Sequence, residues 1–367
     1  MAKNRSANPK RLALLRERMA LGKAEAFLVT HLPNVFYLCG FTGDAGALLV
    51  EPDRATLLTD SRFTTQAKEE LKGTGVRPKI VKGPLASAAA EELARRRLRG
   101  RVAFEGARMT VVDAARLRKA SPQGRLRWQP VTGWVERLRR VKDADEIERI
   151  RAAARLACDV IVEVLPLIKP GVRESDLAAE IEFRMRRRGA SGAAFETIVA
   201  SGPRGALPHA RPSAKVLQAN ELVVIDMGAI LRHYCSDITR TVFLGHASGK
   251  VRRWYRAVAE AQAAACEALR AGAPVEAPDV AARRVLRGYG LARAFVHSTG
   301  HGLGIEVHEE PRLGRGQLQP LDRSSVVTIE PGVYLEGIGG IRIEDDLLVL
   351  PGGAEMLTDA PREFLEL

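Results

Sequence analysis

Residues 223–241 read VVIDMGAILRHYCSDITRT, and this stretch decides the fold of the C-terminal half of the chain. Its two runs of Val, Ile and Thr predict paired strands at residues 221–231 and 233–244, joined by a tight turn. Asp226 follows the first apolar run, so the fold would bury its carboxylate, and a buried carboxylate needs a cation or hydrogen-bond donors to stay ionised. Asp237 comes 11 residues later, and antiparallel pairing would bring both carboxylates to one place.

A second predicted hairpin repeats this arrangement further along the chain, with strands at residues 325–335 and 340–350. The first strand contains TIEPGVY and the second begins within GGIRIEDD. Glu330 and Glu344 lie 14 residues apart in these segments and can face the same point. Arg342 lies two residues before Glu344, and strand alternation puts both side chains on one face.

Three of the seven histidines lie in one glycine-rich segment between the hairpins. Residues 297–311 read HSTGHGLGIEVHEEP and supply His297, His301 and His308. Glycines let a backbone approach a ligand closely. The segment ASGPRGALPHA at residues 200–210 adds His209. These histidines are therefore candidates for a site shared with the carboxylates.

Each of these elements alone also has a structural interpretation, such as a satisfied histidine or a salt bridge between Glu344 and Arg342, but their order and spacing together favour metal binding. Four carboxylates and one imidazole exceed the needs of a single ion with three protein ligands, and suit two ions about 3.5–4 Å apart that share carboxylates. Oxygen-rich ligation favours Mn²⁺, with Co²⁺ or Zn²⁺ as alternatives. Water between two such ions would have its pKa lowered toward about 7, which supplies hydroxide for attack on a carbonyl.

The composition is that of a folded protein with two domains: 367 residues, 46% hydrophobic and 28% charged. No apolar run of about 18 residues occurs, so no membrane-spanning segment is expected. The basic residues 1–11 are not followed by the apolar run of a secretory signal. The four cysteines lie far apart, which predicts no disulfide framework and favours the reducing cytoplasm.

The two halves of the chain show different patterns. Residues 1–140 alternate strands and helices, which predicts an α/β domain with strands at residues 26–30, 47–50, 55–58 and 101–105 and a helix at 62–72. Residues 141–367 predict an α+β domain of helices packed on antiparallel hairpins. Its helices are expected from a capping box at Asp143 to about residue 167, and at residues 174–188, 250–271 and 277–288.

Positive charge is concentrated in the first half. Residues 1–140 carry a net charge of +15 and residues 141–367 a net charge of −2, within a total of +13. No interleaving of aromatic and basic residues accompanies this charge, so nucleic acid is not an expected partner. The arginine runs 95–97 and 186–188 fall in predicted helices, where charges usually form a solvated face. The basic half could instead guide the carboxylate of an anionic ligand.

The motifs quoted above resemble those of the metallopeptidase family of Xaa-Pro aminopeptidases, prolidases, methionine aminopeptidases and creatinases. The resemblance implies an α+β "pita-bread" catalytic domain at residues 141–367. The segments GFTGDAGALLV and LLTDSRF resemble the smaller N-terminal domain of the Xaa-Pro peptidases, so the similarity extends over almost the whole chain. It predicts an α/β accessory domain at residues 1–140.

The resemblance implies a role for each candidate residue. Asp226 would bind one metal ion, His301 and Glu330 would bind the other, and Asp237 and Glu344 would bridge both. The remaining candidates would act on the substrate or hold the ligands: His308 at the scissile carbonyl, His209 and His297 in substrate orientation, Arg342 behind the ligand carboxylates, and Tyr334 in a pocket for proline. His233 departs from the family pattern, because many relatives have a glycine at that place in the turn.

The resemblance implies hydrolysis of the bond before proline by a hydroxide that bridges two metal ions. The substrates would be small peptides with proline second, cleaved by an Xaa-Pro aminopeptidase, with a prolidase restricted to Xaa-Pro dipeptides as the alternative. Arg312 favours dipeptides, because some prolidases use an arginine there to bind the free carboxylate. A binding protein without activity would be expected to lack the ligands. Relatives also imply a homodimer or a higher homo-oligomer.

Overall fold

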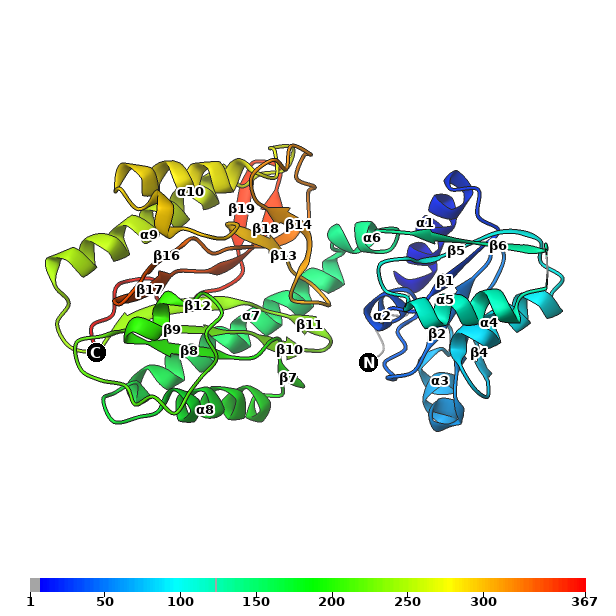
Figure 1. The fold of residues 1–367 in the computed structure, drawn as a ribbon, viewed down its shortest axis with the longest axis horizontal. Coiled ribbons are helices and arrows are strands. Elements are labelled where there is room, and N and C mark those ends of the chain that lie inside the picture. The colour runs from blue at the N-terminus through cyan, green and yellow to red at the C-terminus, as the bar shows by residue number, and fades with distance from the viewer. Residues whose placement is uncertain (1–6, 123) are drawn as a thin grey trace. The chain divides into compact units, whose positions relative to one another are not determined.

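The computed structural model describes residues 7–122 and 124–367. Contacts divide the chain into two compact units, Met1–Arg139 and Arg140–Leu367. Figure 1 shows the elements of each unit. No helix within the described ranges is long and apolar enough to cross a membrane.

The first unit is built around one mixed sheet of six strands in the order β4-β3-β2-β1-β5-β6. The strands β1, β2 and β3 pair antiparallel, and the outer pairs are parallel. The strands are β1 (Ala26–Val29), β2 (Ala47–Val50), β3 (Ala55–Thr59), β4 (Val76–Ile80), β5 (Gly100–Glu105) and β6 (Leu126–Val131). The helices are α1 (Ala7–Leu21), α2 (Leu32–Cys39), α3 (Thr64–Glu70), α4 (Leu85–Arg95), α5 (Val111–Ala120) and α6 (Glu136–Arg140). The four strands predicted for this half are confirmed.

One local prediction in this unit was wrong, and one helix was not predicted. Residues 32–39, between the first two predicted strands, form helix α2, because Pro33 starts a helical turn and Gly40 ends it in the left-handed conformation. The run 95–97 is not a helical face, because α4 ends at Arg95 and Arg97 adopts φ 60°. Arg96 is only 16% exposed and pairs with the buried carboxylates of Glu51 and Glu92, so its charge stabilises the core boundary instead of facing water.

The second unit places two pairs of helices on opposite sides of antiparallel strands (Figure 1). Helices α7 (Ala144–Val164) and α8 (Glu174–Arg187) share an apolar core with β8 (Ile198–Ser201), β9 (Leu222–Met227) and β12 (Ile238–Phe243). Helices α9 (Gly249–Ala268) and α10 (Ala277–Gly288) share another with β15 (Val326–Ile329), β16 (Gly332–Leu335), β17 (Gly339–Arg342) and β18 (Asp345–Leu350). The remaining strands are β7 (Gly192–Ala193), β10 (Ala229–Leu231), β11 (Tyr234–Cys235), β13 (Gly300–Gly302), β14 (Glu309–Leu313) and β19 (Gly353–Met356).

The helix predictions for this unit hold to within a few residues. The capping box at the start of α7 is present, since Asp143 accepts from the Glu146 backbone and the Glu146 side chain accepts from the Asp143 backbone. The α-helix ends at Val164, before a 3₁₀ turn that contains Pro166. Proline lacks the N–H that would continue the helical ladder, which explains the early end.

Both predicted hairpins form, with one difference. In the first, β9 pairs with β12 while β10 pairs with β11, and the second likewise divides into β16–β17 and β15–β18. The turn between β10 and β11 holds Arg232 and His233 at φ 52° and 70°. Two left-handed residues in a two-residue loop are typical of a type I′ turn, a conformation that glycine adopts most easily. None of the four cysteines, all of which lie in the described part of the chain, forms a disulfide bond.

Candidate metal centre and active site

The two hairpins and the histidine segment converge on one cavity of about 630 Å³. Asp226 lies on β9, Asp237 just before β12, Glu330 just after β15 and Glu344 just before β18. His301 lies on β13, between β14 and β15 in the sheet. All five predicted metal ligands line this cavity: Asp226, Asp237, His301, Glu330 and Glu344.

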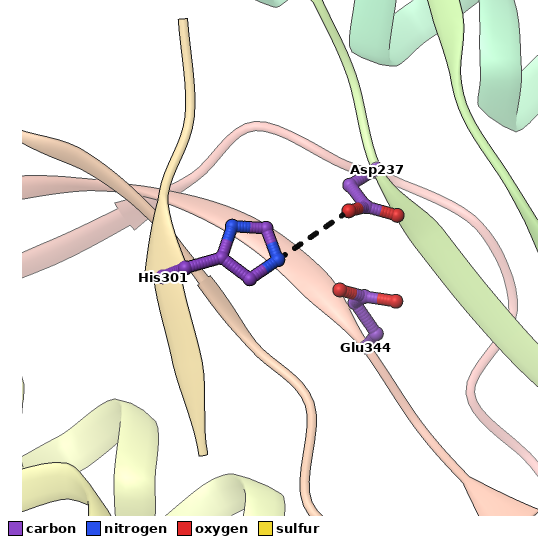
Figure 2. Close-up of side chains that lie close together, drawn as sticks. All are labelled: Asp237, His301 and Glu344. Carbon is purple, nitrogen blue, oxygen red and sulfur yellow. Dashed lines mark ion pairs between the residues drawn. The ribbon is translucent and has the colours of Figure 1, made fainter. Parts of the chain in front are cut away.

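Figure 2 shows the closest part of this cluster, in which the side chains of Asp237, His301 and Glu344 point toward one another. One ligand atom of each lies within 4.8 Å of the others. His301 Nε2 is 3.7 Å from Asp237 Oδ2 and 3.5 Å from Glu330 Oε1. His301 Nδ1 lies 3.0 Å from the Gly302 carbonyl oxygen, which can only accept. The proton therefore belongs on Nδ1, and the Nε2 lone pair faces the carboxylates.

The carboxylates of this cluster are buried and short of hydrogen-bond donors. Asp226 Oδ1 and Asp237 Oδ1 are buried without any partner, and Glu344 accepts from Thr239 Oγ1 at 2.5 Å. Burial first, and then the charges of neighbouring carboxylates, raise the pKa of Asp237 and Glu344 well above their ordinary values. Burial also raises the pKa of Glu330 to about 8. Oxygen atoms crowded in this way fit divalent cations, which would supply the missing positive charge.

Arg342, which lines the cavity, pairs with Asp226 rather than with Glu344. Its Nη2 donates to Asp226 Oδ2, its Nε donates to Thr239 Oγ1 at 3.1 Å, and its Nη1 donates to Tyr334 OH at 2.7 Å. The guanidinium group is 4% exposed, so these contacts use most of its donors. Arg342 thus holds one ligand directly and, through Thr239, a second.

His297 is fixed at the other end of this network. Its Nε2 lies 2.8 Å from Tyr334 OH, and its Nδ1 lies 2.8 Å from the Ser298 carbonyl oxygen. Burial lowers the pKa of His297 to about 4, so the ring is neutral at pH 7. Because the Ser298 carbonyl oxygen can only accept a hydrogen bond, Nδ1 carries the proton. Nε2 is then the acceptor, and the Tyr334 hydroxyl donates to it. The hydroxyl of Tyr334 is therefore used by Arg342 and His297.

The other predicted residues differ in their relation to the cavity. His209, His297, His308, Arg312 and Arg342 line it, and the His308 ring lies 4.4 Å from the ring of His301. Tyr334 is not among the lining residues, so the structure gives it a supporting place rather than contact with a substrate. In the apolar part of the lining, Pro208 and Ala210 belong to the ASGPRGALPHA segment quoted above, whereas no motif pointed to Phe195 and Ile198.

Comparison with protein families decides the classification. Residues 148–351 match the description "Metallopeptidase family M24", and residues 11–141 match "Creatinase/Prolidase N-terminal domain". The chain belongs to metallopeptidase family M24. The first match includes all five candidate ligands, and the second extends over nearly all of the first unit.

Relatives within the M24 family match along the full chain. An uncharacterized peptidase, YqhT, of Bacillus subtilis is 38% identical, with 93% of this chain and 95% of that protein covered. The solved structure of an Xaa-Pro dipeptidase from Bacillus anthracis is 35% identical with a TM-score of 0.93, and covers 98% of this chain and 100% of that one. An X-Pro aminopeptidase from Thermotoga maritima is also 35% identical with a TM-score of 0.89, and covers 97% and 99%. The resemblance to Xaa-Pro peptidases and the pita-bread fold are thereby confirmed.

Thr239 is a member of this M24 site that the sequence analysis missed. It donates to Glu344, accepts from Arg342 and is fully buried. The signal was present, because Thr239 follows Asp237 by two residues on a strand and so shares its face. Cys235, by contrast, is buried with its Sγ near the Ile305 carbonyl oxygen, outside the ligand group.

Proposed function

We propose that this chain is an Xaa-Pro aminopeptidase that releases the residue before proline from small peptides, with the narrower activity of a prolidase as the alternative. The observation that carries the proposal is the crowding of five ligand side chains at one cavity, two of them with buried oxygens that no donor reaches. Such a cluster stabilises the fold poorly on its own, because each buried carboxylate lacks compensation. It therefore favours a bound metal pair over a purely structural role.

In this proposal Asp226 would hold one divalent ion, His301 and Glu330 would hold the other, and Asp237 and Glu344 would contribute to both. The metals would supply Lewis-acid polarisation of the substrate carbonyl and a lowered pKa for an attacking water. Mn²⁺ is the preferred ion, because the ligands are mainly carboxylate oxygens, with Co²⁺ or Zn²⁺ as alternatives. Arg342 keeps the Asp226 carboxylate in place for this task.

The remaining side chains would position the peptide. His308 lies beside His301 on the cavity wall, where its imidazole can donate to the scissile carbonyl oxygen or to the departing proline nitrogen. Burial lowers the pKa of His308, which leaves a neutral ring with one N–H donor at pH 7. His209 and the neutral His297 would orient the backbone of the substrate. The apolar lining suits the ring of proline, and Phe195 offers the largest such surface.

Peptide length separates the two candidate activities. Relatives of both kinds are similar to this chain: an Xaa-Pro dipeptidase and an X-Pro aminopeptidase of solved structure are equally identical, and further relatives are named Xaa-Pro dipeptidases. Arg312 lines the cavity and is exposed, which suits the free carboxylate of an Xaa-Pro dipeptide. The cavity volume of about 630 Å³ leaves space for longer peptides.

The test is hydrolysis of Gly-Pro, Gly-Pro-Ala and longer peptides by metal-depleted protein reloaded with Mn²⁺, Co²⁺ or Zn²⁺. We expect cleavage before proline with Mn²⁺ and an increase in rate when the metal is added. Asp237→Asn should abolish this activity without unfolding the protein. Cleavage of the dipeptide alone would favour the prolidase, and an unchanged Asp237→Asn rate would contradict the proposed metal site.

A further inference from the structure

A second hollow of about 290 Å³ borders the candidate active site. It shares three lining residues with the active-site cavity: His297, Ser298 and Arg312. The rest of its lining comes from α10 and from the segments on either side of β13 and β14, with Arg283, Val296, Gly314, Arg315 and Gln317. We call it the arginine hollow, because Arg283, Arg312 and Arg315 surround it.

The lining of this hollow is strongly cationic. Three guanidinium groups line it, and no carboxylate does so within the described part of the chain. The carboxylate of Asp279 is fully buried, accepts from Arg283 Nε at 2.7 Å and lies 4.0 Å from Arg315 Nε. One buried negative charge therefore faces two arginines, which leaves a net positive charge at the hollow. Glu276 accepts from the Gly316 backbone N–H and does not line the hollow.

The three arginines differ in how much of their hydrogen-bonding capacity is already used. Arg283 is 14% exposed and donates to Asp279 and to the carbonyl oxygens of Phe295 and His297, so it contributes charge rather than free donors. Arg315 is 67% exposed, and Asp279 Oδ2, at 4.0 Å from its Nε, is too far away to accept a hydrogen bond. Arg312 is exposed and has only a 3.4 Å contact with Ser298 Oγ. Arg312 and Arg315 can thus present planar donor pairs to a carboxylate.

The position of His297 connects the two hollows. Its ring contacts Tyr334 on the side of the metal cluster, while Arg283 Nη2 donates to its backbone carbonyl from the side of the arginine hollow. Ser298 and Arg312 form the shared border. A peptide whose proline lies in the active-site cavity would therefore extend past these two residues toward Arg315.

We propose that the arginine hollow binds the C-terminal carboxylate of substrates longer than a dipeptide, with Arg315 as a specificity-determining residue. The inference rests on the proposed peptidase function and extends it from the scissile bond to the far end of the peptide. A dipeptide places its carboxylate at Arg312 on the shared border, whereas a tri- or tetrapeptide carries it onward to Arg315. The chemistry recognised is a free carboxylate, held by exposed guanidinium groups beside an exposed apolar side chain, Val296.

The experiment compares Ala-Pro-Gly and Ala-Pro-Gly-Gly as free acids and as C-terminal amides, together with Ala-Pro. Arg315→Ala should raise KM for the better free acid roughly 5- to 30-fold, the effect of losing one charge-assisted contact that is partly exposed. The same substitution should change KM for the amide and for Ala-Pro by less than about twofold. In the wild type, 0.5 M NaCl should reduce the preference for the free acid over the amide. Arg293→Ala is the matched control, because Arg293 is also exposed and nearby but does not line the hollow.

Binding without turnover keeps the two proposals separable. Calorimetric titration of EDTA-treated protein with the same acid and amide pair measures the carboxylate preference directly, and Arg315→Glu should abolish it. Equal affinity for acid and amide, or an equal effect of Arg315→Ala on both, would overturn the arginine hollow even if hydrolysis proceeds. Failure to cleave any of the five peptides in the presence of added metal ion would overturn the proposed peptidase function. A preference for the acid in the titration would still support carboxylate binding at the arginine hollow.

Discussion

Two glutamates of the second unit are equally buried and differ in almost everything else. Glu174, at the start of α8, is 0% exposed, and Glu344 is 1% exposed. Glu174 accepts five hydrogen bonds, from the backbone N–H and hydroxyl of Ser201, the backbone N–H and hydroxyl of Ser213, and Arg204 Nε. Glu344 accepts from Thr239 and shares the candidate metal site with three other carboxylates.

The pKa values of the two groups move in opposite directions. Burial raises the pKa of Glu174, but the hydrogen bonds from Ser213, Ser201 and Arg204 outweigh burial and lower it below its ordinary value. At Glu344, burial and the charges of Glu330 and Asp226 act together and raise the pKa. Burial alone thus does not mark a functional carboxylate. A carboxylate that the fold buries without donors is held ready for a ligand that brings positive charge.

Asp345 shows how local this distinction is. It directly follows Glu344 and is also fully buried, yet it accepts from Arg240 Nη2, Gln262 Nε2, Thr358 Oγ1 and Arg362 Nε. Adjacent residues of an extended chain point to opposite faces. One face of this strand therefore carries a satisfied structural carboxylate, and the other carries a candidate metal ligand.

Glu344→Gln gives the largest expected effect, a loss of metal-dependent Xaa-Pro hydrolysis of more than about 100-fold, since a bridging ligand is worth at least as much as an outer-shell partner. Glutamine resembles the protonated carboxyl that the raised pKa implies. The free energy of unfolding in EDTA, measured with urea, should therefore not fall. Asp345→Asn is the contrasting control and should lower that free energy by about 3–5 kcal/mol, because buried Arg240 loses its charge partner. A Glu344→Gln protein as unstable as Asp345→Asn would contradict the distinction.

The metal-free protein should lose stability as the pH rises from 6.5 to 8. The pKa of Glu330 is raised to about 8, so its folded form keeps a proton that the unfolded chain, with an ordinary pKa of 4.5, has released. The folded state then binds more protons than the unfolded state, and stability falls by about 1.4 kcal/mol per pH unit for each such carboxyl. The pKa values of His297 and His301 are lowered to about 4, so these two rings change the stability mainly below pH 6.5, outside the range from pH 6.5 to 8.

Urea unfolding at several pH values in EDTA measures this slope. Mn²⁺ should displace the protons, raise the unfolding free energy and flatten the dependence on pH. Glu330→Gln should reduce the slope in EDTA. A stability that rises between pH 6.5 and 8 without metal would show that the cluster is stabilised by the protein alone.

The sequence was sufficient for the parts of this site that depend on local pattern. Arg342 and Glu344 both line the cavity, although β17 ends at Arg342 and β18 begins only at Asp345. Hairpin spacing predicted the approach of Asp226 to Asp237, because β9 and β12 pair as neighbouring strands. The capping box at Asp143 is local in the same sense.

Other features could not be read from the sequence because they depend on contacts between distant segments. Phe195 reaches the cavity from a segment without a motif, and Tyr334 is turned to Arg342 and His297 rather than to the cavity. Nothing in the sequence distinguishes Glu174 from a solvated glutamate in the first turn of a helix. Its partners Ser201 and Ser213 lie 27 and 39 residues away.

Glu174→Gln tests the satisfied member of the comparison, with a smaller expected loss of stability than Asp345→Asn. The amide offers one acceptor oxygen, and its NH₂ group would face donors from Ser201 or from Ser213 and Arg204. We expect a loss of about 1–2 kcal/mol in unfolding free energy. Glu196→Gln is the matched control, because Glu196 is 59% exposed and its ion pair with an exposed arginine contributes little.

The position of this loss can be measured as well as its size. Glu174 ties Ser201 to Ser213, the two ends of the loop that carries His209 into the cavity. Within that loop trypsin can cut only after Arg204, because Arg211 precedes Pro212. Glu174→Gln should therefore make the Arg204–Gly205 bond accessible to trypsin. It should also raise KM for Ala-Pro more than it lowers kcat, since His209 loses its support but the candidate metal ligands keep theirs. If Glu174→Gln loses stability while trypsin leaves the loop uncut and KM is unchanged, Glu174 is a core residue that does not affect the active site. The contrast with Glu344 would then concern stability alone.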